Sequence, residues 1–112
     1  MSALVGADVV SRVVERGKLV YASALSPQPA NDVKAQTERV LSEIDHLLAL
    51  AGSGRSRLLT ARIRLHDLSL SEAHEAAWRE WLGAASRPVV AFTQAELSPT
   101  GTLVEILVTA TK

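Results

Sequence analysis

The last apolar stretch of the chain, TLVEILVTA at 102–110, restricts the possible folds more than any other segment. Apolar and β-branched residues dominate it, which is typical of a β-strand. Successive side chains of a strand point to opposite faces, so one face carries Val104, Ile106, Val108 and Ala110, and the other carries Leu103, Glu105, Leu107 and Thr109. The first face is wholly apolar and must be covered. The second face holds Glu105, which needs water, a partner or a ligand because an unpaired buried charge is costly.

Other segments also predict strands. Two of them are expected at 9–15 and 18–22, around a turn at 16–17, and two more at 58–65 and 89–96. The 58–65 strand alternates, with apolar residues on one face and Arg62 and Arg64 on the other. These two guanidinium groups either form ion pairs within an oligomer interface or stay in solvent, or else they form an anion site between subunits.

Two helices are predicted between the strands. The first follows the loop at 26–32, which ends in an N-cap, and its apolar residues recur at helical spacing as far as Ala51. Ser69 and Glu72 have the spacing of a capping box for a second helix at about 70–82. The order β-β-α-β-α-β-β over residues 1–112 predicts a single α+β domain, with both helices on one face of one mixed sheet.

Two helices can cover only one face of such a sheet. The sequence also places apolar side chains on strands where no helix is expected to reach, namely Tyr21, Val90, Phe92, Leu103 and Leu107. Large exposed apolar patches are typical of interaction surfaces, so we expect the open face to be covered by further copies of the chain.

Charge and cysteine content exclude several classes of function. Twelve basic residues balance twelve acidic ones, whereas proteins that bind nucleic acids or anionic membranes rely on excess positive charge. The chain has no cysteine, which excludes disulfides, thiolate nucleophiles and cysteine-ligated zinc. Neither a signal peptide nor a membrane span is apparent, so we expect a cytoplasmic protein with no nucleic-acid or membrane partner.

Two short motifs resemble a phosphate loop and a zinc site, but each lacks a residue that the site requires. GSGRS at 52–56 lacks the Gly-Lys-Ser/Thr ending of a phosphate loop, and HEAAW at 74–78 has Trp78 where the zinc motif HExxH needs its second histidine. We expect His74 at the surface or boundary of its helix, and Trp78 and Trp81 in the core. No metal and no cofactor is predicted.

The chain nevertheless resembles the RidA (reactive intermediate/imine deaminase) family over nearly its whole length. The resemblance is carried by GKLVYASA at 17–24, by QTERVLSEIDHLLALAGSGRSRLLTARIRLHDL at 36–68, by AWREWLG at 77–83 and by RPVVAFTQAELSPTGTLVEILVTA at 87–110. It implies a chorismate-mutase-like fold and a homotrimer whose sheets meet around a central barrel, with small-molecule clefts between subunits. Active members hydrolyse reactive enamines or imines to a 2-keto acid and ammonia.

The resemblance also implies site residues. In active members an arginine in a Pro-x-Arg context on the penultimate strand binds the substrate carboxylate, and a glutamate in the final strand faces the same cleft. Glu105 matches that glutamate and is the candidate catalytic residue, whereas Val90, or Val89 if the count slips by one, stands in place of the arginine. The resemblance also implies cleft positions at Ser23, in Ala22-Ser23 or Ser23-Ala24, and at Ala91. Tyr21 and Phe92 of the uncovered sheet face are further ligand-binding candidates, and Arg87, Arg62 and Arg64 are alternative cations.

Two functional hypotheses follow. The first is a RidA-like homotrimer without the usual deaminase activity, because Val90 replaces the carboxylate-binding arginine. It would bind a different, less anionic small molecule in its inter-subunit clefts, or act on an unidentified substrate. The alternative is an active deaminase or hydrolase on an atypical imine, enamine or carbamate, using Glu105 with another arginine. A purely structural or protein-interaction role is a third possibility.

Overall fold

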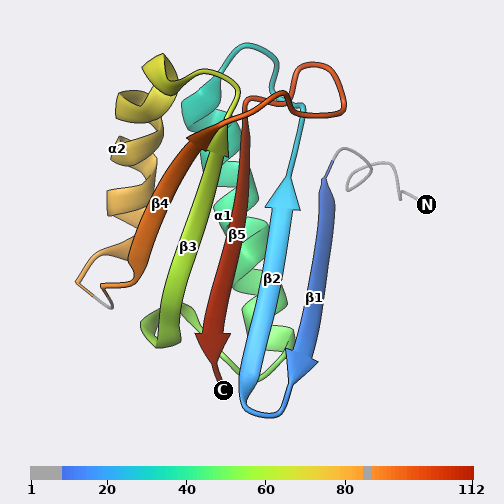
Figure 1. The fold of residues 1–112 in the computed structure, drawn as a ribbon, viewed down its shortest axis with the longest axis vertical. Coiled ribbons are helices and arrows are strands. Elements are labelled where there is room, and N and C mark those ends of the chain that lie inside the picture. Colours follow the sequence, from blue (N-terminus) through green and yellow to red (C-terminus); the bar gives the residue numbers. More distant parts are fainter. Residues whose placement is uncertain (1–8, 85–86) are drawn as a thin grey trace.

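The chain forms a five-stranded sheet with two helices packed on one of its faces, in a computed structural model that describes residues 9–84 and 87–112 (Figure 1). The strands and helices are β1 (Val10–Arg16), β2 (Leu19–Leu25), α1 (Val33–Leu50), β3 (Leu58–Leu65), α2 (Ser71–Leu82), β4 (Val89–Gln94) and β5 (Val104–Thr111). Two short 3-10 helices, η1 (Arg55–Arg57) and η2 (Leu68–Leu70), precede β3 and α2. The α+β fold with two helices on a single mixed sheet confirms the predicted fold class.

The strand order in the sheet is β1-β2-β5-β3-β4, so the C-terminal strand lies at the centre. β3 and β4 are parallel and are connected through α2, whereas the other neighbouring strands are antiparallel. In Figure 1, α1 crosses behind the strands and the uncovered face of the sheet points towards the reader. We call this uncovered face the open face.

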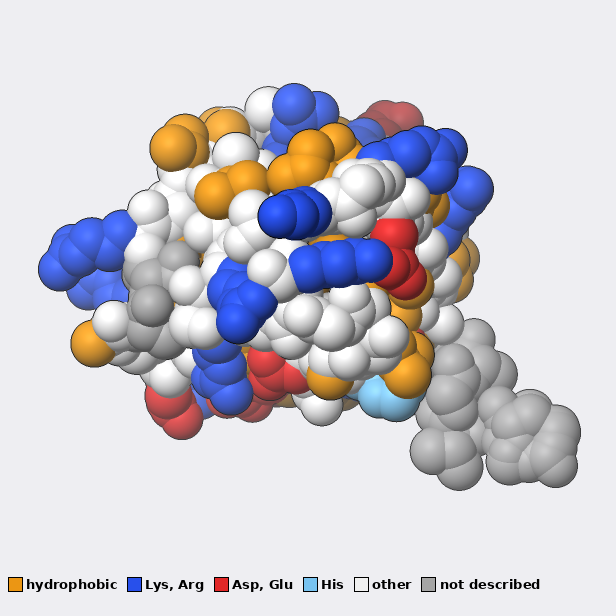
Figure 2. Space-filling model, turned by 90° about the horizontal axis from the view of Figure 1, so that it is seen from below, with side chains coloured by type: hydrophobic (Ala, Val, Ile, Leu, Met, Phe, Trp, Pro, Cys, Tyr) orange, Lys and Arg blue, Asp and Glu red, His pale blue; other side chains and the backbone are white. Residues whose placement is uncertain are grey.

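One end of the molecule is rich in Lys and Arg side chains. It is the lower end in Figure 1, with the β1–β2 turn and the C-terminus, and Figure 2 looks at it directly. Exposed Arg16 and Lys18 flank the turn, and exposed Arg57 precedes β3. None of these three has an ion pair with a described residue. The overall charge balance of the chain therefore conceals a local positive region.

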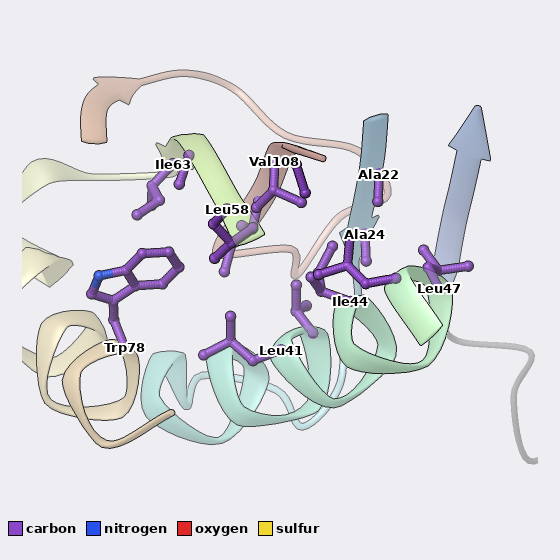
Figure 3. Close-up of a cluster of buried hydrophobic side chains, with 14 of the residues drawn as sticks. Ala22, Ala24, Leu41, Ile44, Leu47, Leu58, Ile63, Trp78 and Val108 are labelled. Carbon is purple, nitrogen blue, oxygen red and sulfur yellow. The ribbon is translucent and has the colours of Figure 1, made fainter. Parts of the chain in front are cut away.

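The core lies between the sheet and the helices (Figure 3). Leu41, Ile44 and Leu47 of α1 point towards the sheet, and Trp78 enters from α2. From β5 the core receives Val104, Ile106, Val108 and Ala110, all at most 3% exposed. The prediction that this wholly apolar face of the last strand is covered by the helices is therefore confirmed.

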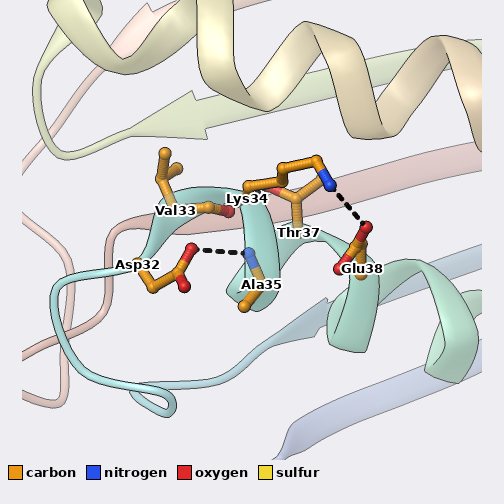
Figure 4. Close-up of polar contacts among 6 residues, drawn as sticks. All are labelled: Asp32, Val33, Lys34, Ala35, Thr37 and Glu38. Carbon is orange, nitrogen blue, oxygen red and sulfur yellow. Dashed lines mark hydrogen bonds and ion pairs between the residues drawn. The ribbon is translucent and has the colours of Figure 1, made fainter.

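The two helices begin differently. Asp32 caps α1, because its carboxylate accepts a hydrogen bond from the Ala35 backbone N–H at 2.9 Å (Figure 4). The capping box predicted for Ser69 and Glu72 is wrong. α2 begins after Leu70, which makes no side-chain cap, and it is the carboxylate of Asp67 that accepts a hydrogen bond from the Ser69 N–H, at the start of η2. The extra 3-10 turn moves the first turn of α2 beyond the reach of Ser69.

Three residues that we expected on the open face lie on the helix side. The parallel register places Val90 beside Ala61 and Phe92 beside Ile63, and both partners are buried beneath the helices. Val90 packs against the core, and the Phe92 ring lies 5.9 Å from that of His74. Leu103 also packs against the core, because β5 begins only at the next residue and the strand alternation does not extend to it.

Candidate functional site

Glu105 lies on the open face and is paired with Arg64. The β3–β5 register places the two residues directly opposite each other, and the Arg64 Nη1 donates a hydrogen bond to Glu105 Oε1 at 2.6 Å. The Glu105 side chain is 18% exposed and that of Arg64 is 39% exposed. The carboxylate in the middle of the last strand is therefore neutralised by a guanidinium of the same chain.

The row of side chains next to this pair crosses all five strands. Arg12 of β1 is opposite Ser23 of β2, Ser23 is opposite Leu107 of β5, and Leu107 is opposite Arg62 of β3. The row continues to Ala91 of β4, which lies beside Arg62. Arg12 and Arg62 thus stand on the same face of the sheet, on either side of a serine and a leucine.

Above this part of the sheet the open face is hollowed, with a volume of about 430 Å³. The hollow is lined by Arg12, Val14, Tyr21, Ala22, Ser23, Thr60, Arg62, Leu107, Val108 and Thr109. Its polar lining consists of two arginines and four hydroxyl groups, and it contains no carboxylate. Among the described residues, none of these six polar side chains has a hydrogen-bond or ion-pair partner.

Only some of the predicted cleft residues come together here. Tyr21 and Ser23 line the hollow, and Ala91 adjoins it through Arg62. Val90 and Phe92 face the helices, as described above, and so point away from Tyr21 and Ser23.

Arg87 is exposed, but the structure does not bring it near Glu105. Thr93 is the β4 residue beside Arg64, and Arg87 precedes it by six positions, which is roughly 20 Å along an extended strand.

Sequence reasoning missed Arg12 and Thr60. The signal for Arg12 was present, since a tight turn at Gly17 fixes the register of the β1–β2 hairpin and thereby places Arg12 opposite Ser23. Thr60 carried a weaker signal, because the β3–β5 pairing shifts register between Leu58 and Thr60.

A second polar group is buried on the helix side. His74 is fully buried, contrary to the expectation of a surface or boundary position, and its Nδ1 is 3.1 Å from Thr37 Oγ1. The Thr37 hydroxyl donates its single proton to the Val33 carbonyl at 2.7 Å, so Nδ1 must carry the ring proton and donate to Thr37. The Nε2 atom has no partner among the described residues. Burial lowers the pKa of His74 to about 4, while Glu75 opposes the shift, so the ring is neutral at neutral pH.

The described residues contain no group of three or more His, Asp or Glu side chains that could hold a metal ion. Among the helices of the described ranges, none is long and apolar enough to cross a membrane.

Comparison with known proteins gives matches along nearly the whole chain. The family profile described as Endoribonuclease L-PSP matches residues 2–112. A RutC family protein of Haemophilus influenzae is 36% identical over 104 residues, which cover 91% of this chain and 90% of that protein. A RutC family protein of Haemophilus ducreyi is 33% identical over 107 residues, with 92% of each protein covered.

Solved structures give the same result. A member of the YjgF protein family from Neisseria meningitidis has a TM-score of 0.83 and 32% identity, over 89% of this chain and 84% of that chain. A member of the YjgF/YER057c/UK114 family from Mycobacterium tuberculosis has a TM-score of 0.81 and 29% identity, over 99% of this chain and 91% of that chain.

Proposed function

We propose a function from the premise that the chain belongs to the endoribonuclease L-PSP family, which is the family of the RidA and YjgF proteins. The protein forms a homotrimer with small-molecule clefts between its subunits, and it lacks the imine deaminase activity usual in RidA proteins. Each part of this proposal has its own support and its own test.

The observation that carries the proposal is the pattern of charge on the open face. β4 presents Val89, Ala91 and Thr93 there, so the strand on which RidA resemblance implies a carboxylate-binding arginine presents no cation. Losing a charge-assisted contact weakens ligand binding by roughly 10- to 100-fold. In addition, Glu105 already binds Arg64, which reduces the freedom of its carboxylate to orient a water molecule.

The trimer is supported by the apolar side chains of the open face. Val10 is 56% exposed and Tyr21 is 41% exposed in the isolated chain. Burying such side chains against another copy is favourable, at about 25 cal/mol per Å² of apolar surface. Analytical ultracentrifugation is the test, with an expected mass of three times 12.0 kDa. A mass of a single chain at micromolar concentration would refute the trimer.

The lack of deaminase activity is tested with freshly generated 2-iminopropionate and 2-aminoacrylate. The expected result is keto-acid release at the uncatalysed rate, with an active RidA protein at equal subunit concentration as the positive control. Acceleration comparable to that control would refute this part of the proposal.

One observation favours the alternative, an active hydrolase on an atypical imine, enamine or carbamate. Arg62 is exposed on the same face of β3 as Arg64 and has no ion pair with a described residue, so it could bind a substrate anion close to Glu105. In that case a panel of such substrates should yield turnover that Glu105→Gln abolishes. If no member of the panel is turned over, the alternative is refuted.

RNA cleavage, which the name of the matching family suggests, is not part of this proposal. The chain has no net charge, whereas RNA binding relies on positive surfaces and on aromatic side chains that bases can stack on. Trp78 is buried, and the Trp81 indole donates a hydrogen bond to Asp45 and has the Arg55 guanidinium stacked over its ring.

A further inference from the structure

We propose that Arg12 and Arg62 together bind a small organic dianion in the hollow of the open face, with one guanidinium at each end of the ligand. The proposal deepens the proposed function and rests on it, because the remaining wall of the cleft would come from a neighbouring subunit. It concerns two arginines at positions other than the one where the RidA resemblance implies a substrate-binding arginine.

The geometry of the sheet sets the distance between the two cations. Arg12 and Arg62 belong to one row of paired residues that runs through Ser23 and Leu107. Three strand spacings separate them, which is about 14 Å between Cα atoms. Both side chains border the same hollow, so their guanidinium groups can approach a ligand from opposite ends.

The chemistry of the lining favours an anion. The hollow contains two guanidinium groups, four hydroxyl groups and no carboxylate, and its lining includes the apolar open-face residues Val14 and Leu107. Guanidinium groups bind carboxylate and phosphate oxygens in a bidentate manner. The nearest carboxylate along the sheet is that of Glu105 in the adjacent row, and Arg64 already neutralises it.

The requirement for two negative charges follows from the number of unpaired cations. A monoanion would leave one arginine beside the ligand without a partner, whereas a dianion engages both. The volume of about 430 Å³ is within the range of small-molecule sites. Arg16 and Lys18, which have no ion pair with a described residue, lie at the adjacent end of the molecule. Their charges raise the local positive potential and so favour the approach of anions.

Isothermal titration calorimetry of the full chain tests the proposal with four ligands of similar length. Glutarate carries one charge at each end, glycerol 3-phosphate carries both charges on one phosphate group, butyrate is the monoanion and glutaramide is the neutral analogue. We expect glutarate to bind more tightly than glycerol 3-phosphate and butyrate, and glutaramide not to bind. Arg12→Gln and Arg62→Gln should each weaken the binding of glutarate by roughly 10- to 100-fold.

Arg79→Gln is the matched control, because Arg79 is an exposed arginine of α2, on the helix side of the sheet, and does not line the hollow. It should leave glutarate affinity within about twofold, since an exposed charge on the other side of the sheet is largely screened. Equal losses in all three variants would overturn the proposal, because binding would then follow net charge alone. Binding of butyrate as tight as that of the dianions would overturn it too.

Ultracentrifugation of each variant separates this proposal from the one it rests on. If Arg12→Gln or Arg62→Gln dissociates the trimer, the arginines form ion pairs between subunits and the dianion site is refuted. A wild-type trimer that does not bind glutarate refutes the dianion site alone. A wild-type monomer refutes the proposed function and, with it, the shared cleft.

Discussion

Protonation of the buried His74 should destabilise the fold between pH 6.5 and pH 4. An unfolded histidine takes up a proton near its ordinary pKa of 6.5, whereas burial lowers the pKa of His74 to about 4. Over this interval the unfolded state binds more protons than the folded state, so stability falls as the pH falls. The difference of about 2.5 pH units, at 1.36 kcal/mol each, gives a loss of about 3 kcal/mol.

The structure explains why the ring resists protonation. His74 is fully buried between Trp78 and Phe92, and its proton sits on Nδ1, where Thr37 accepts it. A second proton would have to go on Nε2, which has no acceptor among the described residues. Glu75 on the next position of α2 partly offsets this cost.

The assay is urea denaturation from pH 7 to pH 4 at one fixed protein concentration, for the wild type and for His74→Leu. Other carboxylates titrate in both proteins, so the difference between the two free energies of unfolding isolates His74. On acidification, the free energy of unfolding of the wild type should fall by about 3 kcal/mol relative to that of His74→Leu. Ile44→Val is a control that loosens the core by about 1 kcal/mol without removing a titrating group, and its difference from wild type should not depend on pH. Parallel curves for the wild type and His74→Leu would refute the reasoning.

Three further predictions concern other parts of the molecule. A double-mutant cycle with Arg64→Met and Glu105→Gln should give a coupling of about 0.5–1 kcal/mol in urea denaturation, limited by the exposure of Arg64, and a coupling of zero would contradict direct pairing. Asp32→Ala should lower the free energy of unfolding by about 1 kcal/mol and Asp32→Asn by much less, whereas equal losses would show that the cap contributes nothing. Val89→Arg should change the free energy of unfolding by at most about 0.5 kcal/mol, because Val89 is exposed on the open face. Val90→Arg forces a charge against the core and should lower the free energy of unfolding by more than about 2 kcal/mol. The reverse order would show that the faces of β4 are assigned wrongly.

Sequence patterns predicted those parts of the fold in which one face differs clearly from the other. In β5, Val104, Ile106 and Val108 alternate with Glu105, and only one assignment of faces buries the apolar set. The first helix was predictable for the same reason, because its apolar residues recur at helical spacing.

β4 lacks such a contrast. Val89, Ala91 and Thr93 are nearly as apolar as Val90, Phe92 and Gln94, so local sequence does not decide which set is buried. The decision comes from the parallel register with β3, which is a property of the tertiary structure.

The sequence contains a pattern that indicates the burial of His74, although the prediction did not use it. His74, Ala77 and Trp78 recur at helical spacing, and all three are buried on the inner side of α2. A histidine within an apolar stripe of this kind was readable as an inner residue. The pairing of Glu105 with Arg64 was not readable in this way, because it requires knowing that the last strand inserts beside β3 and in which register.

The strand order also bears on the proposed lack of deaminase activity. β3 lies between β5 and β4, and Val89 precedes Thr93, the β4 residue in the row of Glu105 and Arg64, by four positions. A cation at position 89 would therefore lie roughly 16 Å from Glu105 between Cα atoms. In this chain the cation nearest to Glu105 is on β3, one spacing away, and the two groups are in direct contact at 2.6 Å. Arg64 therefore already occupies the carboxylate that a substrate would have to contact. A change at Val89 alone would restore the outer cation but would leave this contact in place, so we expect Val89→Arg to gain deaminase activity only when Arg64 is also replaced by a small uncharged residue.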